Sequence, residues 1–171
     1  KPVNTPEDLE GLKIRVMESV TAMEMVSSLG GSPTPISWGE LYTSLQQGVV
    51  DGAENNPPSF YLSRHYEVCK FYSLDEHTVL PDVLIAGTHL WERLSAQERI
   101  WLQEAATESV KEQRKLWAIS EAEALEEVEK AGVTIIRPDK TLFSDKVGSI
   151  YDQYKSDKEM YQLIQDIREN H

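Results

Sequence analysis

The chain has 171 residues, of which 17 are Lys or Arg and 29 are Asp or Glu, so its formal net charge is −12. Hydrophobic residues make up 40% of it, and a chain of this length removes roughly 70% of its unfolded surface from water on folding. This composition argues for a folded globular protein and against disorder. Without a dense run of Lys or Arg, an acidic chain lacks the charge pattern of a nucleic-acid binder. No stretch approaches the roughly 18 apolar residues of a membrane span, which argues against membrane insertion.

The first half of the chain alternates predicted helices and strands. Thr5 precedes Pro6 and two acidic residues, a pattern typical of a helix start. Residues 12–16 alternate apolar and basic side chains, as a strand does, and place Arg15 near the strand's end. Further helices are expected over residues 20–29, 38–45 and 59–67, and further strands over residues 33–36, 49–50, 68–72 and 79–86. This alternation predicts an α/β layer architecture.

The second half of the chain is predicted to be mainly helical. Residues 95–98 have the spacing of a capping box, and neither Gly nor Pro occurs from there until Gly132. A helix over 96–131 would be roughly 50 Å long, which exceeds the needs of one small lobe. A short strand over 133–136 and helices over 139–155 and 158–169 complete the prediction.

Several kinds of chemistry lack their sequence signals. His65, His77 and His89 are spaced at intervals of twelve, which is not the short spacing typical of zinc sites. Cys69 has no second cysteine to pair with. The chain also lacks glycine-rich phosphate loops and the Gly-x-Ser-x-Gly motif of serine hydrolases. We therefore expect no metal, no cofactor and no catalytic residue.

Four residues are suited to holding a small polar ligand. Arg15 ends a strand that should be buried, and its planar guanidinium matches a carboxylate with two parallel hydrogen bonds. Trp38 begins a helix, where its ring could close a pocket or stack on a sugar. Asn55 and Asn56 lie in a polar turn and offer amide donors and acceptors. Structural roles are also open for each: an internal ion pair for Arg15, core packing for Trp38, and turn formation for the asparagines.

Longer strings of the sequence resemble one family. They are TPEDLEGLKIRV (residues 5–16), LGGSPTP (29–35), ELY (40–42), LQQGVVDGAEN (45–55) and HYEVCKF (65–71). Taken in this order, and with the long charged helix, they resemble the DctP-type substrate-binding proteins of tripartite ATP-independent periplasmic (TRAP) transporters. The resemblance covers nearly the whole chain and implies the fold of a periplasmic-binding-protein lobe, a mixed sheet flanked by helices.

The resemblance assigns roles residue by residue. It implies that Arg15, in the Lys-x-Arg-Val strand, forms the salt bridge to the ligand carboxylate. Asn55, in the Asp-Gly-x-Glu-Asn turn, is implied to contact the ligand, and Trp38 to line the site. Glu54 and Asn56, on either side of Asn55, complete this part of the predicted ligand-binding set.

Two departures from relatives that bind sialic acid bear on the ligand. Glu18 stands where those relatives often have Asn, and Met17 stands where some have Pro. The runs 54–61 and 75–78 look more like those of relatives that bind uronic or other sugar acids. Glu18 is included in the predicted site because an acidic side chain there suits ligand hydroxyls better than a second carboxylate. We therefore expect a sugar acid with one carboxylate.

The resemblance also implies a domain organisation. Family members have about twice this length and two lobes, so we expect residues 1–95 to be the second, ligand-binding lobe. Residues 96–131 would then be a spanning helix, and residues 132–171 a C-terminal strand and helices. On this interpretation the chain is the C-terminal part of a longer protein, lacks the N-terminal lobe, and binds ligand weakly when alone.

The predicted function is that of a periplasmic protein that captures an organic acid, such as a uronate, and delivers it to the membrane permease subunits of a TRAP transporter. Two alternatives remain open at this point. A sugar-acid enzyme could anchor its substrate on Arg15 and use Glu18 or Glu54 as a base. A ligand-sensing domain of a regulator could share the same architecture.

Overall fold

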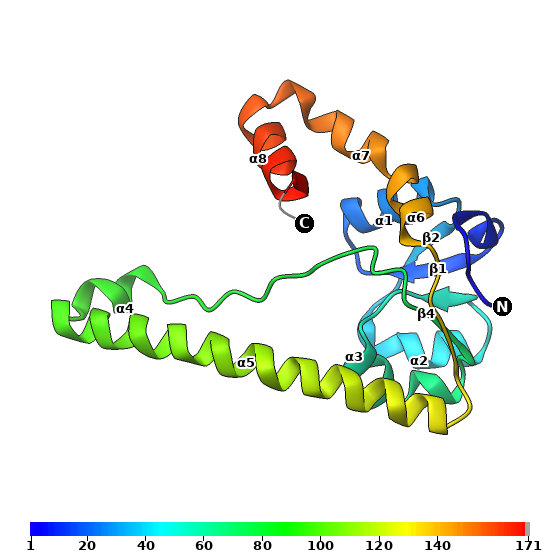
Figure 1. Cartoon of the computed structure of the whole chain (residues 1–171), viewed down its shortest axis with the longest axis horizontal. Coiled ribbons are helices and arrows are strands. Elements are labelled where there is room, and N and C mark those ends of the chain that lie inside the picture. The colour runs from blue at the N-terminus through cyan, green and yellow to red at the C-terminus, as the bar shows by residue number, and fades with distance from the viewer. Residues whose placement is uncertain (170–171) are drawn as a thin grey trace.

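The computed structural model describes residues 1–169 and contains two small parallel sheets (Figure 1). The first has the strand order β2-β1-β3, with β1 over Lys13–Val16, β2 over Ser32–Pro35 and β3 over Gly52–Ala53. The second pairs β4 (Phe71–Ser73) with β5 (Thr134–Ile136). The chain is thus an α/β protein, as the sequence predicts.

Helices connect the strands of the first half. They are the 3-10 turn η1 (Pro6–Leu9), α1 (Val20–Ser28), α2 (Trp38–Gln46), α3 (Pro57–Leu62) and the 3-10 turn η2 (His65–Glu67). Gly48, whose φ is +69°, follows the end of α2. A left-handed residue after a helix is the common way to stop it, and glycine adopts that conformation at the lowest cost.

The second half is mostly helical, also as predicted. Its elements are α4 (Thr88–Arg93), α5 (Ala96–Lys130), α6 (Lys140–Lys146), α7 (Gly148–Asp152), the 3-10 turn η3 (Gln153–Ser156) and α8 (Lys158–Glu169). The predicted capping box starts α5: Ser95 Oγ accepts from Glu98 N at 3.3 Å, and Glu98 Oε2 accepts from Ser95 N at 2.8 Å. These bonds satisfy two N–H groups that a helix start leaves unpaired.

Two hydrophobic clusters hold the elements together. The first lies around β1 and combines residues from η1, α1 and α6, namely Leu9, Ile14, Val16, Val26, Leu29 and Phe143. The second joins α3 to the C-terminal end of α5 through Phe60, Val128 and Val133. The long helix is therefore fixed to the body at its C-terminal end, which Figure 1 shows lying beside α3.

The sheet differs from expectation in one respect. We expected a mixed sheet, but β1 pairs in parallel with both β2 and β3, and β4 with β5. A crossover between β1 and β2 through α1, and from β2 to β3 through α2, returns each strand in the same direction. The carboxyl ends of β1, β2 and β3 consequently meet at one edge, where α/β sheets usually bind ligands.

Several predicted boundaries were wrong. The predicted strand over 79–86 is extended but forms no strand with the described residues, and its side chains are exposed, with Val79 at 88%. Its apolar pattern suits a strand, but strand formation also needs a neighbour. The predicted strand at 49–50 is a turn that precedes β3, and the one over 68–72 begins only at Phe71.

Two predicted helices are interrupted. The helix expected over 59–67 breaks at Arg64, whose φ of 59° is left-handed. The helix expected over 139–155 is divided into α6, α7 and η3. The helix expected over 38–45 is confirmed as α2, and that over 96–131 as α5.

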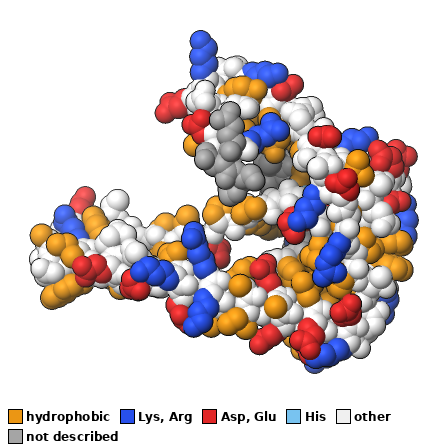
Figure 2. All heavy atoms as spheres, viewed as in Figure 1, with side chains coloured by type: hydrophobic (Ala, Val, Ile, Leu, Met, Phe, Trp, Pro, Cys, Tyr) orange, Lys and Arg blue, Asp and Glu red, His pale blue; other side chains and the backbone are white. Residues whose placement is uncertain are grey.

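The region formed by the segment 78–90 and the N-terminal two thirds of α5, here called the arm, extends away from the sheets (Figure 1). Large apolar side chains on it are exposed, among them Leu80, Ile85, Trp101, Leu116 and Trp117. Figure 2 shows hydrophobic and charged side chains interspersed along it. Within residues 1–169, none of the helices combines the length and apolar character needed to cross a bilayer.

Candidate functional site

The predicted ligand-binding residues lie at the carboxyl edge of the first sheet. Arg15 is opposite Thr34 of β2 and Ala53 of β3 in the strand register. Trp38 begins α2 shortly after β2, and Glu54 directly follows β3. Residues that are up to 39 positions apart in the sequence are therefore carried to the same edge by three adjacent parallel strands.

Arg15 is held in a nearly buried position. The residue is 4% exposed, and its Nε donates to the carbonyl oxygen of Ile36 at 2.8 Å. Its two terminal nitrogens donate no hydrogen bond to the described residues, although neither is fully enclosed. Burial lowers the pKa of Arg15 from its ordinary value, and the charge of Glu54 opposes that change. The guanidinium is thus fixed at Nε, and its two terminal nitrogens can bind an anion.

Aromatic side chains border Arg15 on the side of α2. The guanidinium carbon lies 5.7 Å from the centroid of the Trp38 ring, within the range of a cation–π interaction. The Trp38 residue is 47% exposed, so part of its indole remains available to a ligand. Behind it lies His65, which is 4% exposed and which the sequence did not single out as a site residue.

Glu54 supplies a carboxyl group on the opposite side of the edge. Burial raises the pKa of this carboxyl from its ordinary value, while the charges of His77 and Arg15 act to lower it. No side chain of the described residues donates a hydrogen bond to Glu54, so its oxygens can accept hydrogen bonds from ligand hydroxyls.

A histidine–aspartate pair lies near Glu54. His77 Nδ1 is 2.7 Å from Asp75 Oδ1, and both side chains are less than 20% exposed. Burial disfavours the charged ring, but the hydrogen bond and charge of Asp75, together with the charge of Glu54, raise the pKa of His77 above its ordinary value. His77 Nε2 is the one fully buried side-chain polar atom without a partner among residues 1–169. From the sequence, residues 75–78 are described only as resembling those of relatives that bind uronic or other sugar acids.

Asn55 and Asn56 form the turn that leads from β3 into α3. Asn56 Oδ1 accepts from Ser59 N at 2.9 Å and so caps the helix, while Asn55 Oδ1 accepts from Asn56 N at 2.9 Å. The Tyr72 hydroxyl donates to the Asn55 carbonyl oxygen at 2.6 Å and fixes the turn. Since the side-chain oxygen of Asn55 is occupied, its NH₂ group is left to donate to a ligand oxygen.

Glu18 is less closely connected to the other predicted residues. It is exposed in the loop between β1 and α1. The hydrogen bonds and ion pairs found within residues 1–169 do not join it to Arg15, Trp38 or Glu54. Its role in the site stays a prediction.

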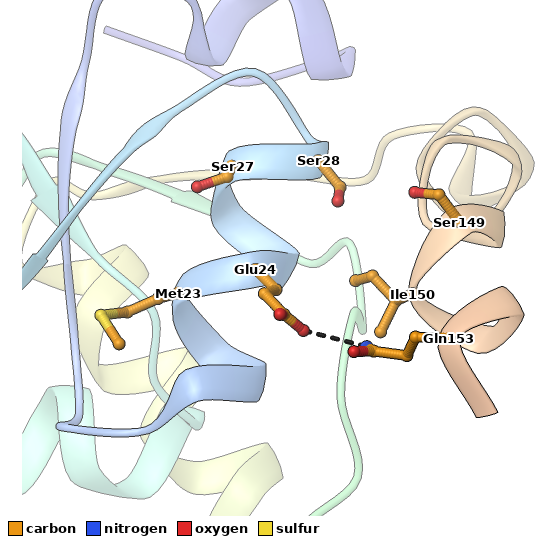
Figure 3. Close-up of a pocket in the computed structure, with 7 residues that line it drawn as sticks. All are labelled: Met23, Glu24, Ser27, Ser28, Ser149, Ile150 and Gln153. Carbon is orange, nitrogen blue, oxygen red and sulfur yellow. Dashed lines mark hydrogen bonds between the residues drawn. The ribbon is translucent and has the colours of Figure 1, made fainter. Parts of the chain in front are cut away.

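Two hollows have linings that do not include Arg15. One, of about 370 Å³, runs between α1 and α7, where Glu24 accepts a hydrogen bond from Gln153 at 3.0 Å (Figure 3). The other, of about 260 Å³, lies between the segment 75–77 and α6. In the part of the chain that the structure describes, no three His, Cys, Asp or Glu side chains converge in a way that could hold a metal ion.

Comparisons with known proteins agree with this architecture. Residues 1–157 match the DctP family, described as bacterial extracellular solute-binding protein, family 7. A solute-binding protein of Chromohalobacter salexigens is 44% identical over 170 residues, which are 98% of this chain and 51% of that protein. The chain belongs to this family of extracellular solute-binding proteins, and it spans about half the length of the relatives it matches.

Solved structures show the same likeness. A TRAP periplasmic solute-binding protein of C. salexigens with bound D-glucuronate matches with a TM-score of 0.94 and 43% identity, over 100% of this chain and 57% of that one. Another, from Bradyrhizobium, in complex with D-galacturonate, matches with a TM-score of 0.89 and 40% identity, over 99% of this chain and 57% of that one. Both of these structures are therefore of periplasmic TRAP proteins that hold a sugar acid.

Proposed function

We propose that this chain is the carboxylate-recognising lobe of a periplasmic solute-binding protein that captures a uronate. The observation that carries the proposal is the nearly buried Arg15, whose free end forms no ion pair with the described residues. A buried charge is costly unless an opposite charge pairs with it. A ligand carboxylate would supply that charge through two parallel hydrogen bonds.

The rest of the edge suits a sugar acid. Trp38 offers a half-exposed ring against which a sugar can pack, and Glu54 offers acceptor oxygens for hydroxyls. The free NH₂ group of Asn55 donates to an oxygen of the ligand. Two of the similar solved structures hold D-glucuronate and D-galacturonate, which combine one carboxylate with several hydroxyls.

The biological setting is part of the proposal. Because the relatives are TRAP periplasmic proteins, we infer a periplasmic location and delivery of the ligand to the membrane permease subunits of such a transporter. We also infer that the protein binds its ligand without chemical conversion. Mass spectrometry of D-glucuronate incubated with the protein should return unchanged ligand, and turnover would instead support a sugar-acid enzyme.

The proposal can be tested on the chain itself by NMR. D-Glucuronate is titrated into ¹⁵N-labelled protein, and the Arg15 Nε–H and Trp38 indole N–H signals are followed. We expect both signals to move saturably, with a weak affinity, because a second lobe would be needed to enclose the ligand. Arg15→Lys should abolish the response, since an ammonium cannot reproduce the guanidinium fork. The control, Arg93→Lys at an exposed position of α4, should leave it unchanged. Signals that stay still in the unmodified chain would contradict the proposal.

A further inference from the structure

His65 occupies the space behind the aromatic face of α2. Its ring lies 5.2 Å from that of Trp38, edge to face at 67°, and 6.4 Å from that of Tyr42, tilted by 32°. Trp38 and Tyr42 are one helical turn apart and therefore project from the same face of α2. The nearly buried imidazole thus lies against both rings.

The chain makes an unusual turn to place His65 there. Arg64, between α3 and η2, has a φ of 59°, a conformation that costs energy for a residue other than glycine. Glu67 then ties η2 to α2, because its carboxylate accepts from the Tyr42 hydroxyl at 2.8 Å and lies 3.6 Å from Arg64. These contacts fix η2, and with it His65, against α2.

Trp38 needs such support to keep one orientation. It starts α2, is about half exposed, and has no hydrogen bond from its indole to the described residues. The Arg15 guanidinium carbon lies 5.7 Å from the centroid of the Trp38 ring, and the centroid of the His65 ring lies 5.2 Å from it. Burial and the nearby charge of Arg15 both lower the pKa of His65 from its ordinary value, which favours the neutral form of a ring that packs against Trp38.

We propose that His65 is a positioning residue of the ligand site. It holds the Trp38 indole beside the Arg15 guanidinium, so that the carboxylate and the sugar ring of the ligand bind to a site that is already formed. The inference rests on the proposed function for its consequence in binding. Its structural part, the dependence of Trp38 on His65, exists without any ligand. A preformed site binds more tightly because less order must be created on binding.

The ligand-free test compares His65→Ala with His65→Phe in ¹⁵N-labelled protein. The Trp38 indole N–H signal is assigned with Trp38→Phe. We expect His65→Ala to shift and broaden this signal and the Arg15 Nε–H signal, and His65→Phe to restore both, because it keeps a ring in the same place. His89→Ala removes an exposed histidine and should change neither. A Trp38 signal unchanged in His65→Ala would overturn the inference.

The ligand test measures D-glucuronate affinity in the same variants. His65→Ala should weaken binding by roughly 3- to 10-fold, the usual size of a lost aromatic pair, and His65→Phe by less than about 2-fold. In a Trp38→Ala background the further change His65→Ala should have almost no effect, whereas a merely structural role would give an additive loss. An additive loss would overturn the inference even if His65→Ala alone weakens binding.

The two proposals can fail separately. If the unmodified chain does not respond to D-glucuronate but the Trp38 signal still depends on His65, the proposed function fails and the positioning role stands. If D-glucuronate binds and the Trp38 signal is the same with and without the His65 ring, the positioning role fails and the proposed function stands. If far-UV circular dichroism shows that His65→Ala does not fold, His65→Leu takes its place. We then expect the Trp38 indole signal to shift in His65→Leu, and an unchanged signal would overturn the inference.

Discussion

The carboxyl edge of the first sheet and the arm carry similar apolar side chains, but these are buried around the edge and exposed on the arm. Around the edge, Val16 at the end of β1 and Leu41 of the adjoining α2 are fully buried, and even the charged Arg15 is only 4% exposed. On the arm, Val79, Leu84 and Ile85 are each more than 75% exposed. An apolar residue contributes to stability only where neighbouring elements remove it from water. The edge is therefore the region that this chain can organise by its own contacts.

The long helix shows both behaviours along one element. Its C-terminal third packs on α3 and buries Ala124 and Val128. Its first two thirds leave Trp101, Leu116 and Ile119 about half exposed. The proposal that the chain is one of two lobes would account for these side chains, which a further lobe would cover.

The largest expected effect contrasts the two regions in stability. Leu41→Ala at the fully buried position should lower the free energy of unfolding by about 2–5 kcal/mol, because it removes buried methyl groups and leaves a cavity. Leu116→Ala, the same substitution at a position that is 52% exposed, should change it by less than about 0.5 kcal/mol. Urea denaturation of both variants measures the difference, and equal losses would contradict the contrast.

A smaller effect is expected at the turn that carries the asparagines. Asn56→Ala removes the cap of α3 and should cost about 1 kcal/mol of unfolding free energy. Asn56→Ser keeps an oxygen that can accept from Ser59 N and should retain most of the stability. If thermal or urea unfolding shows the two variants equally destabilised, the side-chain cap is not what stabilises this turn.

The smallest effect concerns pH. Because the pKa of His77 is raised in the folded state, the stabilisation from its charged form is fully present below the unfolded pKa of about 6.5 and is lost as pH rises through the folded value. Asp75→Asn should lower the His77 pKa measured by NMR. It should also reduce the loss of stability that occurs as pH rises above about 6.5.

The matched control is Asp82→Asn, which removes an exposed carboxylate from the following segment and should leave the His77 pKa unchanged. A His77 pKa that is unchanged by Asp75→Asn would show that their 2.7 Å contact does not govern its charge.

The elements that could be predicted from sequence are those whose partners lie within the chain. The alternation around Arg15 predicted β1, and the capping box with the distant Gly132 predicted α5 within a residue at each end. The prediction of a strand over 79–86 was wrong because an apolar pattern does not provide the neighbouring strand with which a strand must pair. The break at Arg64 was not predicted because left-handed residues other than glycine leave no clear signal in the sequence.

Part of the candidate site could be proposed from the sequence. Arg15 and Asn55 lie in short motifs that carry the family resemblance, and Trp38 lies three residues after another of these motifs. The parallel strands bring Arg15 and Trp38 to one edge. His65 and the pair Asp75–His77 reach that neighbourhood only through the tertiary fold, since His65 is 27 positions from Trp38. No local spacing could have revealed contacts made at such a separation.

The proposed function requires that Arg15 binds a ligand carboxylate. The most direct measurement compares the NMR affinities for D-glucuronate and D-glucose, which differ in the carboxylate, in the unmodified chain and in Arg15→Ala. The unmodified chain should favour D-glucuronate by at least about 10-fold, since a hydrogen bond to a charged group contributes about 1.5–3 kcal/mol. Arg15→Ala should bind both sugars equally poorly. A preference for D-glucuronate that survives Arg15→Ala within about threefold would contradict the account.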